Sequence, residues 1–143
     1  LKLTSEIDPP QEGDSITAFS VSEDSNTVAV GTLAGSVNFW VRDQSKFEFE
    51  EWKRHGSRIM AMAFLDDSTL ASAARDNTMK FWNLKMKREV VTMGTSHIDE
   101  ISPIFGVTDF DLSPDRTSVL TASGQSRVQI WRKADVVKRR LNR

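Results

Sequence analysis

One set of residues whose types could do chemistry lies in the middle third of this chain. His55, Ser72 and Asp76 are the residue types of a Ser-His-Asp triad, in which a histidine takes the proton of a serine and an acid orients the histidine. Acyl transfer of that kind also needs donors for an oxyanion, and no motif that would supply them accompanies the three residues. A structural network with Trp82 is the alternative, because buried polar groups need hydrogen-bond partners.

Other signals of catalysis are absent from the sequence. Cysteine is missing, which excludes disulfides and thiolate metal sites. His97 has no second histidine or carboxylate pair at metal-ligand spacing, and Gly31 and Gly35 do not precede a helix as phosphate-binding glycines do. We therefore predict that the chain is not an enzyme, has no metal or other cofactor, and acts on no small-molecule substrate.

Length and composition indicate one globular domain. The chain has 143 residues, of which 38% are hydrophobic and 27% charged, and its net charge of −1 favours neither nucleic acid nor membrane. No apolar run reaches the roughly 18 residues of a membrane span, and no secretory signal begins the sequence. We predict no membrane insertion and an intracellular location, in the cytoplasm or nucleus.

Three copies of one pattern position the polar residues. Each copy ends in an apolar residue followed by tryptophan, at Phe39-Trp40, Phe81-Trp82 and Ile130-Trp131, and the tryptophans are 42 and 49 residues apart. Upstream of each tryptophan, short runs of alternating apolar residues are separated by turns rich in Asp, Ser, Pro and Gly, which is typical of strands and hairpins. A further strand is expected after each tryptophan, at residues 46–50, 89–93 and 135–138.

This pattern resembles the WD40 repeat, most closely in the segment from Phe64 through Asp76 to Trp82. The resemblance implies an all-β fold of WD40-type β-propeller blades with four antiparallel strands each, and about three blades in this chain. The predicted units are a linker or closing strand (1–13), a degenerate first blade (14–54), a best-matching second blade (55–96), a third blade with an N-terminal loop insertion (97–138) and a basic tail (139–143).

The resemblance also implies roles for the polar residues. In WD40 proteins the matching positions form a structural network, which assigns to that network His55, Ser72, Asp76 and Trp82 in the second blade. The third blade retains Thr121 and Trp131 but has Gln125 in place of the aspartate. The first blade retains only Trp40, and has Glu12, Val30 and Ala34 where His, Ser and Asp would stand.

Partner binding in this family commonly uses residues beside the first apolar residue of the first strand and the residue before the turn aspartate. The matching residues here are Arg58, Met60 and Arg75 in the second blade, and Thr17 and Leu33 in the first. Because arginine and methionine are enriched at the cores of protein interfaces, we expect other proteins to bind at these positions.

The basic C-terminal residues suggest a second function. A run of cations could contact RNA phosphates, and it comprises Lys133, Lys138, Arg139, Arg140 and Arg143. The leading hypothesis is a protein-interaction scaffold or adaptor subunit of a multiprotein complex. The alternative is an RNA-associated scaffold, in RNA processing or ribosome assembly, that uses this tail.

Three blades would leave two blade faces exposed, because a single blade does not bury its own apolar surface. Three remedies remain open: the chain is part of a larger propeller, it pairs with itself to form six blades, or a partner supplies the missing blades. The weak first blade and the missing initial methionine favour a larger propeller.

Overall fold

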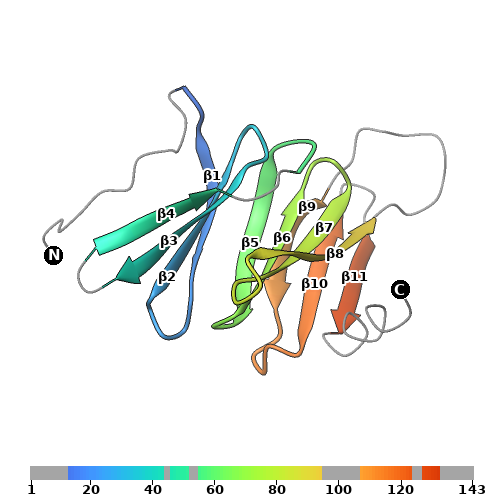
Figure 1. The fold of residues 1–143 in the computed structure, drawn as a ribbon. Helices are drawn as coiled ribbons and strands as arrows, with labels where there is room; N and C mark the ends of the chain where they lie inside the picture. The colour runs from blue at the N-terminus through green and yellow to red at the C-terminus, as the bar shows by residue number, and fades with distance from the viewer. Residues whose placement is uncertain (1–12, 44–45, 52–54, 95–106, 124–126, 133–143) are drawn as a thin grey trace, which may run out of the picture.

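The computed structural model describes residues 13–43, 46–51, 55–94, 107–123 and 127–132. Within these ranges every regular element is a β-strand, and the strands form three antiparallel sheets (Figure 1). The all-β fold predicted from the alternating apolar runs is therefore confirmed. No helix of the described part has the length and apolar character that crossing a membrane requires.

Each sheet is one consecutive stretch of the chain, and we call the sheets the first, second and third blades. The first blade pairs β1 (Ile16–Val21), β2 (Thr27–Thr32), β3 (Val37–Asp43) and β4 (Lys46–Glu51) in that order. The second pairs β5 (Ile59–Asp66), β6 (Thr69–Ala74), β7 (Thr78–Asn83) and β8 (Arg88–Gly94). The third has β10 (Ser118–Ser123) between β9 (Val107–Leu112) and β11 (Arg127–Arg132).

The strands predicted after the first two tryptophans are present as β4 and β8. The strand predicted at residues 135–138 lies outside the described residues, as do residues 1–12 of the linker or closing strand predicted at 1–13 and the insertion before the third blade. The exact limits proposed for the blades and the tail therefore stay predictions.

Aspartate side chains shape the tight turns between strands. In four turns an aspartate carboxylate accepts the backbone N–H of the residue two positions later, which is the geometry of an Asx turn. The aspartates are Asp24, Asp66, Asp76 and Asp115. In three of these turns the intervening residue has a positive φ, at Ser25, Asn77 and Arg116. The carboxylate hydrogen bond thus accompanies a backbone conformation that non-glycine residues seldom adopt.

Each blade has two faces, because side chains along a strand point alternately to opposite sides. We call the face with Phe39, Phe81 or Ile130 the leading face, and the face with the adjoining tryptophan the trailing face. Strand register places equivalent residues on the same face in all three blades.

The hydrophobic core lies between blades. The leading face of the first blade packs on the trailing face of the second, with a buried cluster of Ala29, Val37, Phe39, Ile59, Met62, Phe64, Leu70, Ala74 and Trp82. The leading face of the second packs in the same way on the third, where Phe81 and Met79 meet Val119 and the half-buried Trp131. The innermost strands β1, β5 and β9 contact one another in that order, so the three sheets stand in a row (Figure 1).

Candidate functional site

A chain of hydrogen bonds runs through the second blade. The indole Nε1 of Trp82 donates to Ser72 Oγ at 2.8 Å, and Ser72 Oγ lies 2.7 Å from His55 Nε2. The other imidazole nitrogen, Nδ1, lies 2.9 Å from Thr78 Oγ1, and the Thr78 hydroxyl donates to Asp76 Oδ1 at 2.6 Å. The structure therefore brings together the four residues assigned to the network and adds Thr78 between the imidazole and the carboxylate.

The donor and acceptor groups of these residues determine which atom donates in each hydrogen bond of the network. An ionised carboxylate only accepts, so the Thr78 hydroxyl gives its hydrogen to Asp76 and its oxygen receives the Nδ1–H of His55. Nε2 is then the acceptor nitrogen of a neutral imidazole, and the Ser72 hydroxyl donates to it while accepting the indole N–H. Each hydroxyl donates once and accepts once, so one tautomer satisfies the whole chain.

The network residues come from different elements. Ser72 lies in β6 and Trp82 in β7, both fully buried, whereas His55 lies in the loop before β5 and Asp76 in the turn between β6 and β7. A second oxygen of Asp76, Oδ2, accepts the backbone N–H of Gly56 at 2.6 Å. The network therefore connects two surface loops to the centre of the blade.

The electrostatics of Asp76 follow from these contacts. Burial by itself raises the pKa of the Asp76 carboxyl, but the neighbouring His55 imidazole and hydrogen bonds from Thr78 and the backbone N–H of Gly56 outweigh burial and hold the pKa well below its usual range. The carboxylate therefore stays ionised, which keeps it an acceptor for Thr78 and Gly56.

This arrangement is suited to holding the blade together. A nucleophilic serine must reach a substrate, whereas the Ser72 side chain is fully buried and its hydroxyl is used both as donor and as acceptor. Asp76 Oδ2 is 3.4 Å from His55 Nδ1, and the closer contact of that nitrogen is with Thr78. The geometry thus supports the structural interpretation of these residues.

Thr78 was missed in the sequence analysis, although the sequence contains a signal for it. Three of the described turns contain the pattern Asp-x-Ser/Thr, at Asp66-x-Ser68, Asp76-x-Thr78 and Asp115-x-Thr117. In all three turns the aspartate accepts both the backbone N–H and the hydroxyl of the later residue. A hydroxyl at this position is therefore held beside the carboxylate, ready to meet a further polar group.

The third blade retains a shorter version of the network. The indole Nε1 of Trp131 donates to Thr121 Oγ1 at 2.9 Å, as Trp82 donates to Ser72. His97 and Gln125 lie outside the described residues. The indole-to-hydroxyl bond is thus common to both blades.

In the first blade, the segment before β1 and the turn between β2 and β3 are joined in another way. Val30 stands at the Ser72 position in β2, and Ala34 stands at the Asp76 position. A carboxylate is supplied from the opposite side, because Asp14 Oδ1 accepts the backbone N–H of Ala34 at 3.2 Å. Glu12, the residue at the histidine position, lies outside the described residues.

The residues predicted to bind partners lie near the network, at the loop end of the blades. Arg58 and Arg75 are exposed and adjacent, because the backbone N–H of Arg75 donates to the carbonyl of Arg58 at 3.0 Å. Met60 is half-buried. The same backbone bond joins the exposed Leu33 to Ser15 in the first blade, at 2.8 Å.

Thr17 is placed differently from the other predicted binding residues. It is half-buried, and its hydroxyl donates to the carbonyl of Ile59 in the second blade at 2.7 Å. The Thr17 side chain therefore joins two blades. The predicted RNA-contacting residues of the tail, from Lys133 to Arg143, lie outside the described residues.

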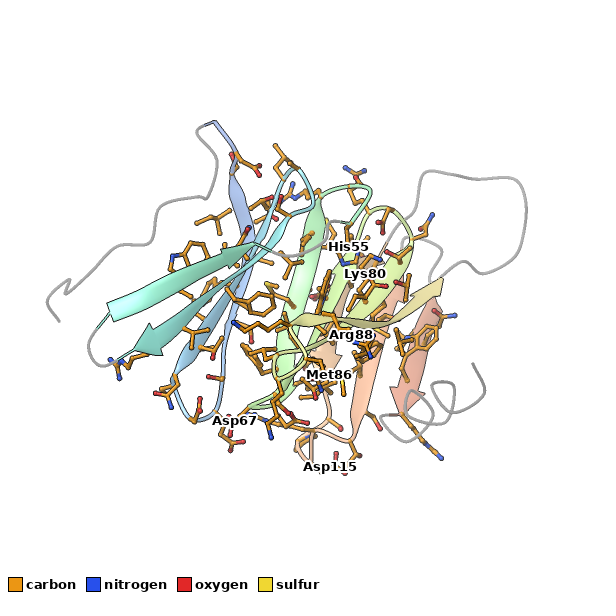
Figure 2. All side chains as sticks on the ribbon, in the orientation of Figure 1. His55, Asp67, Lys80, Met86, Arg88 and Asp115 are labelled. Carbon is orange, nitrogen blue, oxygen red and sulfur yellow. The ribbon has the colours of Figure 1, made fainter. Side chains whose placement is uncertain are left out.

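The turns at the opposite end of the molecule carry exposed charges of both signs, with Lys85 and Lys87 in the turn between β7 and β8. Figure 2 shows Asp67 and Asp115 at the end away from His55, and Glu23 and Asp24 are exposed in the first of the turns at that end. A hydrogen bond of 2.9 Å from Asp24 N to Asp67 Oδ1 and an ion pair of 3.3 Å between Arg116 and Glu23 connect these turns. The described residues contain no group of three or more His, Cys, Asp or Glu that could hold a metal ion.

Comparison with known families finds one match. Residues 47–83 match the family model described as WD40, the WD domain or G-beta repeat. The matched stretch begins in β4 of the first blade and ends with β7 of the second, so it contains His55, Ser72, Asp76 and Trp82. A search of curated proteins finds no match to the chain.

Proposed function

We propose that this chain, which carries a WD40 repeat in a row of antiparallel blades, functions as a protein-interaction scaffold. In this proposal it is a non-catalytic adaptor subunit of a multiprotein complex. The observation that carries the proposal is the exposed pair Arg58 and Arg75 at the loop end of the second blade. With Met60 and Leu33, these arginines form what we call the loop-end patch.

The charges of the loop-end patch are available to a partner. Within the described residues, neither the Arg58 nor the Arg75 guanidinium has an ion pair or a hydrogen bond. A guanidinium presents several N–H donors in a planar fork, which suits bidentate contact with a carboxylate. Leu33 and Met60 add apolar surface, so the loop-end patch combines the charged and apolar contacts found at interface hot spots.

The loop-end patch rests on a rigid support. Arg75 directly precedes Asp76, whose carboxylate is bound to Gly56, Thr78 and, through Thr78, His55. The backbone bond between Arg75 and Arg58 fixes the distance between the two cationic residues. Ordering these loops before a partner arrives reduces the entropy cost of binding.

Charge complementarity indicates the chemistry of the partner. The loop-end patch is cationic, because Arg58 and Arg75 are both exposed in it. An acidic segment is therefore attracted to this patch. We propose that the partner offers Asp or Glu side chains next to an aliphatic or aromatic residue.

The test measures binding of acidic peptides that contain one large apolar residue, using fluorescence anisotropy with the 143-residue chain. Replacing Arg58 and Arg75 together by Glu should weaken binding about a hundredfold, because attraction becomes repulsion at two contacts. Lys85→Glu makes the same kind of charge change at an exposed residue outside the loop-end patch and should leave affinity within about twofold. Equal affinities for the wild type and the double variant would remove the loop-end patch from the proposal.

A further inference from the structure

The leading face of the third blade differs from its equivalents in exposure. Phe39 and Phe81, at matching positions in the first and second blades, are each 1% exposed because the next blade covers them. Ile130 stands at the same position in the third blade and is 65% exposed, as is Val128. The third blade thus presents the apolar surface that the other two bury against a neighbour.

The trailing face of the first blade is also exposed, whereas the equivalent face of the second blade is buried. Met62 in β5 is 7% exposed because the first blade covers it, whereas its equivalent Phe19 in β1 is 71% exposed. Phe64 is buried likewise, and its equivalent Val21 is exposed. One chain therefore has both halves of an inter-blade interface uncovered, one at each end of the row.

The interface between the first and second blades also contains polar contacts, whereas the equivalent positions of the second blade hold Met60 and Ala63. Between the first and second blades, Thr17 Oγ1 donates to the carbonyl of Ile59 at 2.7 Å, and Ser20 Oγ accepts the backbone N–H of Phe64 at 3.2 Å. Both hydroxyls lie on β1 of the first blade, whose leading face forms this interface. Both partners are backbone groups of β5 in the second blade, whose trailing face forms the other side.

The uncovered leading face of the third blade has polar residues at the same two positions. Thr108 matches Thr17, and Asp111 matches Ser20. Within the third blade, Thr108 Oγ1 donates to the carbonyl of Ala122 at 3.3 Å. Thr17 Oγ1 makes the equivalent bond within the first blade, to the carbonyl of Gly31, at the same distance. Thr108 and Asp111 are both exposed, whereas Thr17 and Ser20 are half-buried at the interface.

We propose that two copies of this chain associate head to tail, each placing the leading face of its third blade on the trailing face of the other's first blade. Ile130 and Val128 then pack against Phe19 and Val21. The Thr108 hydroxyl and the Asp111 carboxylate meet the backbone of β1 in the partner copy, as Thr17 and Ser20 meet β5.

A second copy fits these faces because the chain itself supplies both halves of the interface. Joining two copies through both pairs of faces closes a ring of six blades and leaves neither face open. Six lies within the range of roughly four to eight blades that closed propellers have. If only one pair of faces met, the copies would extend into an open chain. The proposal is separate from the loop-end patch, which lies on the loops and not on the blade faces.

The first experiment measures the mass of the 143-residue chain in solution by sedimentation velocity. We expect twice the 16.1 kDa of one chain. Phe19→Asp and Ile130→Asp should each weaken the pair about a hundredfold or more, because a charge would be buried without a partner. Both residues are exposed in the single chain, so each variant should fold, which circular dichroism checks. Met86→Asp changes an exposed apolar residue outside both faces and outside the loop-end patch, and should leave the mass unchanged.

A cross-linking experiment tests the head-to-tail geometry. The chain has no cysteine, so Ile16→Cys and Thr108→Cys provide unique thiols on β1 and β9. When the two single variants are mixed and oxidised, a covalent heterodimer should form that neither variant forms alone. A monomeric wild type, a mass that increases beyond two copies with concentration, a pair that survives both Asp variants, or cross-linking of either variant to itself would each overturn the proposal.

Discussion

The first and second blades have the same strand order but join their loops from opposite sides. In the second blade the carboxylate lies in the turn between strands, where Asp76 accepts the backbone N–H of Gly56 in the preceding loop. In the first blade the carboxylate lies in the preceding loop, where Asp14 accepts the backbone N–H of Ala34 in the turn. In these two blades a carboxylate thus joins the preceding loop to the turn, and it comes from a different segment in each.

The difference between the two blades lies in what the carboxylate connects to. In the second blade it continues through Thr78 and His55 to buried strands, so that surface and core are linked. In the first blade the equivalent hydroxyl, Ser36 Oγ, is buried and has no hydrogen-bond partner among the described residues, and the same is true of the side-chain amide of Asn38. A buried polar group without a partner costs about 1–3 kcal/mol, so the first blade gains less from its polar residues.

The largest expected effect comes from the seam between these blades, at Gly35. Its φ is +87°, and an added Cβ would lie 2.6 Å from the carbonyl oxygen of His55 and 2.8 Å from that of Ser57. Gly35→Ala should lower the free energy of unfolding by about 3–4 kcal/mol, since strain adds to a backbone clash. Gly13→Ala, at φ +85° with open space around the Cβ, should cost only about 1–2 kcal/mol. Urea denaturation measures both, and equal losses would mean that the seam is not tightly packed.

Removing the central hydroxyl should have the next largest effect. Ser72→Ala leaves the indole N–H of Trp82 and the imidazole of His55 without their shared partner, and should cost about 2–4 kcal/mol. Thr121→Ala in the third blade leaves only the indole of Trp131 unpaired and should cost about 1–2 kcal/mol. If the two substitutions cost the same, the histidine contributes nothing to the second blade through this bond.

The carboxylate in the second blade should make stability depend on pH. Because the pKa of Asp76 is lower in the folded chain than the roughly 3.9 of a free aspartate, folding is favoured by the ionised form. That contribution is complete above about pH 5 and is lost as the pH falls through the folded pKa. The stability difference between the wild type and Asp76→Asn should therefore shrink as the pH falls from about 5 to 2. Parallel stability curves for the two proteins would contradict this prediction.

The smallest effect should come from the unpartnered hydroxyl in the first blade. Ser36→Ala removes a buried group that makes no hydrogen bond within the part of the chain that the structure describes, so the free energy of unfolding should change by less than about 0.5 kcal/mol or increase. Thr78→Val at the equivalent position removes a hydroxyl bonded to both Asp76 and His55, and should cost about 2 kcal/mol. A large loss for Ser36→Ala would show that the two blades depend on this position equally.

The strands could be predicted because alternation of apolar residues is a local property of the sequence. It identified even the strands after the first two tryptophans, β4 and β8. The network was less accessible, since Thr78 enters it only through a turn that aims its hydroxyl at an imidazole 23 residues away in the chain. The carboxylate of Asp14 could not be predicted from the repeat, because it replaces Asp76 from a position where the pattern has no acid.

The sequence predicted that two blade faces are uncovered, but it did not identify the polar residues on them. Two uncovered faces were expected from the number of blades. The polar residues that equip them, Thr108 and Asp111, became recognisable only when the bonds of Thr17 and Ser20 between blades were seen. Such bonds depend on how closely two sheets approach, which no single repeat specifies.

The strand register also determines how the row of sheets curves. On the leading face, the large residue of each paired row lies on the third strand: Phe39 beside Ala29 and Ser20 in the first blade, and Phe81 beside Ala71 and Ala63 in the second. In this row both blades are therefore thicker at the third strand than at the first, and we infer that side-chain volume there sets the angle between neighbours. A bulky residue in place of Ala71 would straighten the row of sheets, and so change how many blades complete a circle.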